Sequence, residues 1–431
     1  MIINFSVKNF GPIKDQQTLS FEADKSTHLE DAYVIKAGKL RLLKLALIYG
    51  SNASGKTTLL KALDFLRDLV LYPEDKKTNV FDFDPFLFDT KTPEESSLIS
   101  IEFIQNEIRY FYEVEFMKKA IVKEELTFWN PNKATLYKRK TNLLNQYTEI
   151  TFGSTVKIDK TFKKTLEANT LWNNAVLGGY LKTNIDFQEL NGVISWFQKT
   201  LRPIVWTRTD LEDYVSSQIN SGVIQKLDVI EILRKADFYI SDIQIKEEEK
   251  DIPDSIYEFV LKRLEEENRK IKASDVKKKF ATLDLELVHS VNGKDYRLPF
   301  ESESSGTRRY YGLAGLLALT LKEGMILPVD ELESSLHPDL YEHFLLSFLM
   351  NTKESQIIAT THNREILNKK DLFRNDAIWF TDKNEDCATE LYSLADFDSS
   401  VVRDSTNVLN AYKSGKLGAT PNIADYFLDL D

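Results

Sequence analysis

The sequence predicts an α/β fold that combines a mixed sheet, an antiparallel β subdomain and a mainly helical insertion. Three observations lead to this fold class. An apolar strand at Leu45–Tyr49 runs directly into a glycine-bounded loop and then into a helix. Residues from about 98 to 140 alternate with period two, which is typical of antiparallel hairpins. Residues 155–280 carry apolar side chains mostly at helical spacing.

Composition narrows the class of protein. The 431 residues, 42% of them hydrophobic, are enough for two or three domains or one large domain with insertions. The single cysteine, Cys387, argues against a disulfide framework or a cysteine-based zinc cluster. Apolar runs are shorter than a membrane span, and the first residues lack a charged leader with a cleavage site. We therefore expect a cytoplasmic protein without membrane contact. Its net charge of −11 argues against coating nucleic acid over the whole surface.

The strand–loop–helix unit carries the pattern G-x-x-x-x-G-K-[ST], the phosphate-cradling P-loop. Its glycines allow backbone angles that turn successive N–H groups onto an anion, and the helix N-terminus adds its dipole. A chance match is the alternative, but the strand before and the helix after favour a nucleoside triphosphate site. The expected nucleotide-binding residues are Gly50, Ser51, Asn52, Ala53, Ser54, Gly55, Lys56, Thr57 and Thr58.

The N-terminal third should be strands around one helix. Residues 2–13 alternate and end in Asn-Phe-Gly-Pro, which predicts an opening strand, and a second strand is expected at Gln17–Phe21. Leucines on one face predict a helix from about Lys56 to Leu71. The alternating residues that follow predict an antiparallel meander.

The C-terminal part should return to alternating helices and strands. Ile326–Val329 predicts an apolar strand followed by Asp330 and Glu331, the form of a Walker B strand. Asp330 would then hold Mg²⁺ together with the Thr57 hydroxyl, and Glu331 would orient and deprotonate the attacking water. His362 ends another apolar strand, from which it can reach a γ-phosphate. A surface acidic pair and a capping histidine are the structural alternatives.

A polar loop, Ser304-Ser305-Gly306-Thr307, precedes a long apolar helix. Small residues, a hydroxyl and exposed helix N-terminal amides make it a second candidate anion site, with an ordinary helix cap as the alternative. One chain normally cannot bring this loop onto its own P-loop nucleotide. If the loop acts on a nucleotide, two copies must face each other.

The order of P-loop, S-S-G-T-R-R, D-E-x-E-x-x-L-H-P and T-T-H resembles the ABC-class ATPases of the RecF/SMC/OLD type, many of which are called AAA-type ATP-binding proteins. The resemblance implies an ABC-type head that binds ATP and Mg²⁺ between two paired copies. Ser304, Ser305 and Gly306 would contact the γ-phosphate held by the partner, and Glu331 and His362 would be catalytic. It also implies three parts: an N-terminal lobe at 1–154, a mainly helical insertion at 155–281 and a C-terminal lobe at 282–431.

Some positions depart from that pattern. Glu303 and Ser305 stand where transporters carry Leu and Gly, Pro328 falls in what should be a central strand, and His337 occupies the usual place of a D-loop Asp. Gln105 is a candidate for the Q-loop glutamine.

The chain is too short in the middle for long coiled-coil arms, and it ends too soon after the last head strands for a fused TOPRIM nuclease. Together with a tail of the form Y-x-x-G-x-x-G-A-x-P, these lengths resemble stand-alone ATPase subunits of bacterial antiphage systems, of the RloA type and the PARIS AriA type. The resemblance implies a separate effector protein, often TOPRIM-like. The tail residues are Tyr412, Gly415, Gly418, Ala419 and Pro421.

Three functions stay open at this point. The first is an ATP-dependent switch that holds or releases an effector. The second is a DNA-repair or DNA-maintenance ATPase that clamps DNA directly, using the locally basic stretch 262–279, although a solvated helix face explains that stretch as well. The third is a scaffold that binds ATP to assemble but hardly hydrolyses it.

Overall fold

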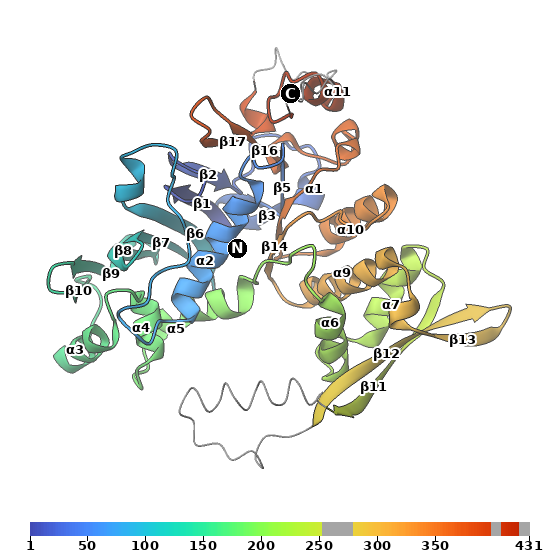
Figure 1. The fold of residues 1–431 in the computed structure, drawn as a ribbon, viewed down its shortest axis with the longest axis horizontal. Helices are drawn as coiled ribbons and strands as arrows, with labels where there is room; N and C mark the ends of the chain where they lie inside the picture. The colour runs from blue at the N-terminus through green and yellow to red at the C-terminus, as the bar shows by residue number, and fades with distance from the viewer. Residues whose placement is uncertain (252–278, 398–406, 422–431) are drawn as a thin grey trace, which may run out of the picture. The chain divides into compact units, whose positions relative to one another are not determined.

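The computed structural model describes residues 1–251, 279–397 and 407–421 (Figure 1). The chain divides into two compact units, which are described separately. Unit 1 comprises residues 1–208, 320–334 and 345–431, and unit 2 comprises residues 209–319 and 335–344. The three-part division expected from the sequence stays a prediction.

Unit 1 contains a five-stranded sheet in the order β14-β15-β5-β16-β17. Its first four strands are parallel, and β17 joins antiparallel to β16. β5 is buried along its whole length, as expected for the apolar strand before a P-loop. The strands are β5 (Leu45–Gly50), β14 (Ile326–Val329), β15 (Gln356–Thr360), β16 (Ile378–Lys383) and β17 (Thr389–Ser393).

A second, antiparallel sheet of seven strands follows the order β10-β9-β8-β7-β6-β1-β2. Its inward side chains alternate with polar ones, most clearly along β7, so one face is packed and the other is solvated. The strands are β1 (Ile2–Lys8), β2 (Gln17–Ser20), β6 (Ser97–Gln105), β7 (Ile108–Met117), β8 (Ala120–Trp129), β9 (Lys133–Asn142) and β10 (Tyr147–Phe152). A short hairpin, β3 (Val34–Ala37) and β4 (Leu40–Leu43), forms a separate two-stranded sheet.

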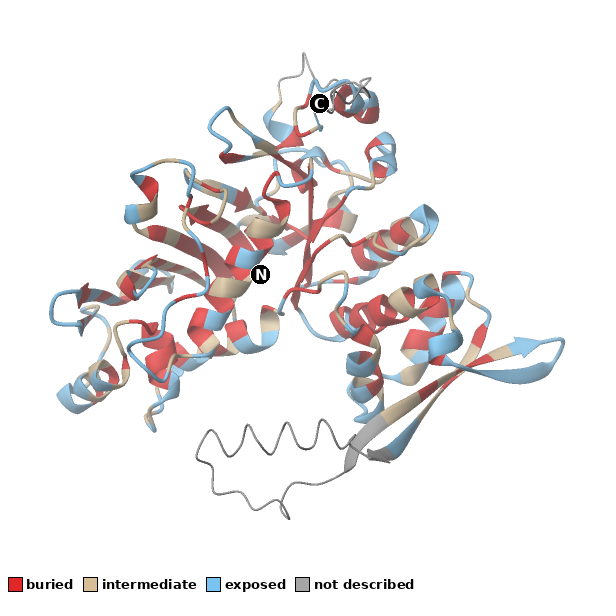
Figure 2. Cartoon of the chain, viewed as in Figure 1, coloured by how far each residue is buried: buried red, intermediate tan, exposed pale blue. Residues whose placement is uncertain are grey.

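Helix α2 (Lys56–Leu71) contacts both large sheets, packing on β1 on one side and on β5 and β15 on the other. The apolar face of α2 is buried (Figure 2). Lys61 and Asp68, on its other face, are exposed. The helix that carries the P-loop is therefore fixed within the core of unit 1. The burial of its leucines holds the N-terminus of the helix in place.

The rest of unit 1 is made of short helices. They are α1 (Glu30–Tyr33), η1 (Thr92–Glu94), α3 (Lys160–Asn169), α4 (Val176–Leu181), α5 (Gln188–Ser195), the π-helical turn η2 (Trp196–Thr200), η5 (Glu365–Asn368), η6 (Asn375–Ala377), η7 (Leu394–Asp396) and α11 (Val408–Lys413).

Unit 2 contains a three-stranded antiparallel sheet in the order β11-β12-β13, with helices packed beside it. Its elements are α6 (Leu211–Asn220), α7 (Lys226–Lys235), β11 (Ile240–Asp251), β12 (Lys279–Val291), β13 (Lys294–Pro299) and η4 (Phe300–Ser302). The unit boundary falls within α9 (Ser305–Lys322) and within α10 (Pro338–Asn351). Gly312 and Gly315 of α9 lie so close to Leu211 and Val215 that a Cβ atom would approach within 2.4 Å of either side chain.

The fold class expected from the sequence is confirmed: a mixed sheet with a P-loop, an antiparallel β subdomain and a group of helices. The P-loop helix has the predicted bounds. One expectation about the sheet is wrong, because Pro328 lies on the edge strand β14 and not on a central one.

Pro328 leaves no hydrogen bond to β15 unmade. Its carbonyl accepts from the Val205 N–H (2.9 Å), so its nitrogen faces the 201–205 segment. Residues of β14 that face β15 keep their N–H groups, which is how an edge strand accommodates proline. In the described ranges, no helix is both long and apolar enough to cross a bilayer.

Candidate nucleotide site

The P-loop of unit 1 joins the end of β5 to the start of α2. Ala53 has φ +61° and Gly55 has φ +106°, so the loop turns through two left-handed residues. Gly55 caps α2 without a side-chain bond, which leaves the first amides of the helix available to an anion. Ser54, Gly55 and Lys56 are buried, and the loop tip at Asn52 and Ala53 is exposed.

The Lys56 side chain folds back over the loop. Its Nζ donates to the carbonyl of Gly50 (2.9 Å) and to that of Ser51 (3.0 Å). Burial lowers the pKa of Lys56, and the nearby carboxylates of Asp330, Glu331 and Glu333 act in the opposite direction. The ammonium group is thus partly desolvated and held among carbonyls and carboxylates, so an arriving phosphate would be a strong partner for it.

Asp330 follows β14 and is 8% exposed. The hydroxyl of Thr57 donates to its Oδ1 (3.0 Å), and the hydroxyl of Thr360 at the end of β15 donates to the same atom (2.7 Å). The structure therefore joins the P-loop threonine to the Walker B aspartate, although 273 residues separate them in the chain. Parallel packing of β14, β15 and β5 explains this, since their carboxyl ends meet at one edge of the sheet.

Glu331 lies in the left-handed region, with φ +47°. Its N–H donates to the Thr360 hydroxyl (2.8 Å), which holds the turn. A non-glycine residue in this region stores strain, which is characteristic of functional positions. The Glu331 carboxylate lies 3.9 Å from Nε2 of His362, and both side chains are nearly half exposed.

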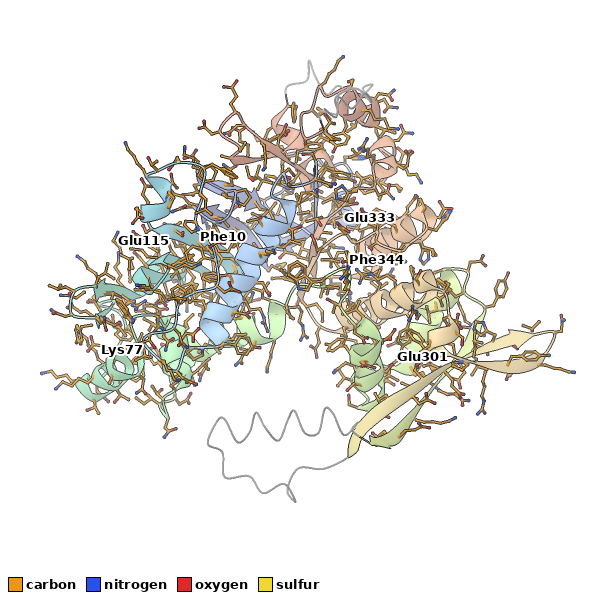
Figure 3. All side chains as sticks on the ribbon, viewed as in Figure 1. Phe10, Lys77, Glu115, Glu301, Glu333 and Phe344 are labelled. Atoms are coloured by element: carbon orange, nitrogen blue, oxygen red, sulfur yellow. The ribbon has the colours of Figure 1, made fainter. Side chains whose placement is uncertain are left out.

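His362 follows Thr361 at the end of β15, and its backbone N–H donates to the carboxylate of Glu333. Burial lowers the pKa of His362 and the Lys56 ammonium lowers it further, while Glu333 and Glu331 act in the opposite direction. Glu333, labelled in Figure 3, has a second carboxylate oxygen that is buried without a hydrogen bond. Sequence reasoning missed Glu333, although the spacing D-E-x-E contains it.

Two further residues missed from the sequence are Thr381 of β16 and Thr389 of β17. The Thr389 hydroxyl donates to the carbonyl of Ser54 (2.8 Å), and the Thr381 hydroxyl lies 2.6 Å from that of Ser54. The threonines stand more than 300 residues after the P-loop on strands without a motif. No local signal in the sequence could have found them.

The loop at 304–306 belongs to unit 2. The Ser304 hydroxyl accepts from the Thr307 N–H (3.1 Å) and lies 2.8 Å from its hydroxyl, so Ser304 caps α9. Ser305 is exposed at the first turn, and a Cβ at Gly306 would lie 3.1 Å from the carbonyl of Ser335. The capping role does not remove the exposed amides at this helix start, so the role toward a partner's nucleotide stays a prediction.

Other candidate positions are less informative. Gln105 is the last residue of β6, at the hairpin to β7, and its Q-loop assignment stays a prediction. His337 is exposed in unit 2, with Nδ1 3.4 Å from the carboxylate of Asp339. The basic stretch 262–279 lies outside the described residues except for Lys279, the first residue of β12.

A cavity of about 620 Å³ runs along α2 from Thr58 to Tyr72.

These residues fit a magnesium–triphosphate group. A hydroxyl and a carboxylate meet at 3.0 Å where Mg²⁺ would need oxygen ligands, and Mg²⁺ typically takes only one or two protein ligands beside phosphates and water. The P-loop backbone also fits phosphates, because its glycines have no side chain to cover the N–H groups that would donate to phosphate oxygens. Thr57 and Asp330 would hold the ion, and the 50–58 segment would hold the phosphates.

A family profile described as "AAA domain, putative AbiEii toxin, Type IV TA system" matches residues 45–368, well over half of the chain. The chain belongs to this AAA family. The match begins with the first residue of β5 and includes the P-loop, Asp330, Glu331 and His362, and it confirms the AAA-type resemblance expected from the sequence. No curated protein matches the chain.

Solved structures that match include heads of SMC proteins. An SMC head bound to the C-winged helix domain of ScpA has 13% identity, covers 91% of this chain and 97% of its own, and has a TM-score of 0.45. The SMC head domain from Thermotoga maritima has 12% identity, 91% and 98% coverage and a TM-score of 0.41. An SMC head with an extended coiled coil, bound to the C-terminal domain of ScpA derived from Pyrococcus furiosus, has 11% identity, 91% and 96% coverage and a TM-score of 0.38.

Proposed function

We propose that this protein binds and hydrolyses ATP with Mg²⁺ as an ABC-type ATPase and uses this cycle as a switch between paired heads. One observation carries the proposal: Thr57 of the P-loop and Thr360 of β15 both donate to Asp330, so the phosphate-binding loop and the metal-binding strand end meet at one carboxylate. Membership of the AAA family supports it.

Each side chain has a distinct task in this proposal. Lys56 leaves its carbonyl partners to pair with the β- and γ-phosphates, and the 50–58 amides orient them. Bound Mg²⁺ supplies charge neutralisation on the phosphates. Glu331 accepts a proton from the attacking water, and His362 holds the γ-phosphate end of the site. The left-handed backbone at Glu331 sets the direction in which its side chain leaves the turn.

The proposed pairing of heads assigns the Ser304 loop to the nucleotide of a second copy. Ser304, Ser305 and Gly306 form the start of helix α9, which the Ser304 hydroxyl caps, and such a helix N-terminus suits an anion brought by a second copy. In the proposed cycle, ATP joins two heads and hydrolysis separates them. Because the loop acts in trans, a head with a defective P-loop still offers a working loop to its partner.

The proposed biological role is that of the sensor or ATPase subunit of an antiphage system that controls a separate effector protein, for which a TOPRIM-like nuclease is the proposed class. The description of the matched family, which names a toxin of a type IV toxin–antitoxin system, supports a defence-related role. The tail pattern Y-x-x-G-x-x-G-A-x-P supports the same role by resemblance.

A complementation assay tests the ATPase and the pairing together. Lys56→Ala should abolish ATP binding, whereas Lys61→Ala, an exposed lysine further along α2, should leave it unchanged. Ser304→Arg should bind ATP but not hydrolyse it. Mixing the Lys56 and Ser304 variants should restore part of the hydrolysis, since the mixture contains one intact composite site. Unchanged ATP affinity in Lys56→Ala would remove the P-loop assignment, and no recovery in the mixture would remove the pairing.

The DNA-clamping alternative depends on residues 262–279, which carry no described side chains. DNA-binding and hydrolysis assays on the wild-type protein distinguish this alternative from the switch. A clamp should bind duplex DNA with an affinity that falls steeply with salt, and DNA should stimulate its ATP hydrolysis. A switch that holds an effector should show neither property but should co-elute with a partner protein.

A further inference from the structure

The β16–β17 hairpin contacts the P-loop through two threonine side chains. Thr389 Oγ1 donates to the Ser54 carbonyl, and Thr381 Oγ1 contacts the Ser54 hydroxyl and the Tyr49 carbonyl (3.3 Å). Ser54 and both threonines are almost completely buried. The inner side of the P-loop is therefore tied to β16 and β17 by hydroxyl groups, and its outer side is left for a ligand.

The hairpin approaches the P-loop so closely that there is no room for a Cβ atom at either P-loop glycine. A Cβ at Gly50 would lie 2.4 Å from Thr381 Oγ1, and a Cβ at Gly55 would lie 2.3 Å from Thr389 Oγ1. Both approaches are closer than carbon and oxygen atoms can come without displacement. The two P-loop glycines thus serve the close approach of these threonines in addition to the phosphates.

Residues 407–421, named here the C-terminal clamp, hold the same hairpin from the other side. Tyr392 of β17 donates its hydroxyl to the Leu417 carbonyl (2.8 Å), and Asp382 of β16 accepts from the Ala419 N–H (2.7 Å). Tyr412 closes the turn by donating to the Ala419 carbonyl (2.9 Å). These contacts give a structural reason for the tyrosine and the Gly-Ala pair in the tail pattern.

The C-terminal clamp also contacts Tyr49, the residue before the P-loop, through the ring of Tyr412. The Tyr412 ring stacks on Phe380 at 5.5 Å and meets Tyr49 edge-on at 6.2 Å between centroids. Tyr49 is the residue that precedes Gly50. Edge-to-face and stacked pairs of this kind add to the burial of the rings and favour one relative orientation.

The C-terminal clamp also reaches the turn after His362. The Arg364 guanidinium lies over the Tyr412 ring at 5.7 Å, and Asn407 donates to the side chain of Asn368 (2.8 Å). Lys413 pairs with Glu365 at 3.8 Å. One segment therefore contacts both the hairpin behind the P-loop and η5, which follows the candidate γ-phosphate histidine.

We propose that Thr381 and Thr389 are positioning residues for nucleotide binding and that the C-terminal clamp holds them, so that its displacement loosens the P-loop and lowers ATP affinity. The proposal rests on the proposed function for its effect on ATP, but its structural part concerns the P-loop alone. It makes residues 407–421 a place where a bound partner could change the nucleotide state without touching the nucleotide.

The first experiment removes one hydroxyl. Thr389→Val keeps the side-chain shape and deletes the bond to Ser54, so ATP affinity should fall about tenfold, the equivalent of one buried hydrogen bond. The rate constant at saturating ATP should stay within about twofold, because Thr389 does not touch the reacting atoms. Thr389→Ser should restore the affinity. Thr352→Val is the matched control, since its buried hydroxyl bonds the Phe348 carbonyl (2.7 Å) away from the site.

The second experiment needs no ATP. Hydrogen exchange should become faster at amides 50–56 in Thr389→Val and in the double variant Tyr392→Phe/Tyr412→Phe, whereas Tyr180→Phe, which loses a comparable hydroxyl contact to Asn191, should leave them unchanged. Unchanged exchange at 50–56 in both test variants would overturn the proposal. If the wild-type protein bound no ATP while both test variants still exchanged faster than wild type at 50–56, the proposed function would be overturned. The structural part of the proposal, the link between the C-terminal clamp and the P-loop, would then stand.

Discussion

Glu331→Gly should make the protein more stable while removing hydrolysis, because the native glutamate occupies the left-handed region at φ +47°. That conformation costs a residue with a Cβ about 1–2 kcal/mol, and glycine avoids this cost. Glycine also gains unfolded-state entropy, which costs about 0.5–1 kcal/mol. The exposed contact with His362 contributes little. The net change in the free energy of unfolding should therefore be a gain of about 0.5–1 kcal/mol.

A matched glycine substitution tests the sign of this change in the free energy of unfolding. Glu385→Gly changes an exposed turn residue that is not among those with positive φ, so it should lose about 0.5–1 kcal/mol. Equilibrium urea unfolding should separate the two variants by about 1–2 kcal/mol. If Glu331→Gly is destabilised as much as Glu385→Gly, the turn is not strained. If it still hydrolyses ATP at the wild-type rate, Glu331 is not the base.

The remaining predictions concern acid, metal and burial. Burial lowers the pKa of His362, so its imidazole stays neutral at pH 7, and hydrolysis should fall only on acidification below the ordinary histidine range, when His362 takes up a proton and pairs with the Glu331 carboxylate. A fall in hydrolysis at acid pH that persists in His362→Gln would assign that fall to another group. Asp330→Asn should weaken Mg²⁺-dependent ATP binding about 10–100-fold, and an unchanged Mg²⁺ titration would remove Asp330 from the metal site. Arg139→Met should lower the free energy of unfolding by about 3 kcal/mol, because it leaves the carboxylate of Glu124 fully buried without its cation at 3.6 Å; urea unfolding should show partial recovery when Glu124→Gln is added.

Local signals account for what the sequence predicted well. The P-loop helix was predicted with its observed bounds because the motif fixes its start and the leucine spacing fixes its face. The meander was equally accessible, since β7 alternates half-buried and buried side chains from Arg109 to Met117. The meeting of Thr57 and Asp330 followed from parallel strand topology, which the motif order implied.

The misses share a different cause. Thr381 and Thr389 matter only through contacts made more than 300 residues away, and nothing around them distinguishes them from other strand threonines. β11 lies in a region expected to be mainly helical, because its second half is a run of charges that hides the alternation. Pro328 was misplaced because strand order within a sheet cannot be deduced from one strand.

The central claim, a switch in which ATP joins two heads, is tested most directly by the mass of Glu331→Gln protein in solution. Light scattering with and without ATP and Mg²⁺ should show the mass of one chain change to that of an even-numbered assembly only when both are present. The assembly should persist because hydrolysis no longer resolves it. Adding Ser304→Arg to the same chain should abolish the change. A mass that ignores ATP, or an assembly that Ser304→Arg leaves intact, would contradict the paired-head account.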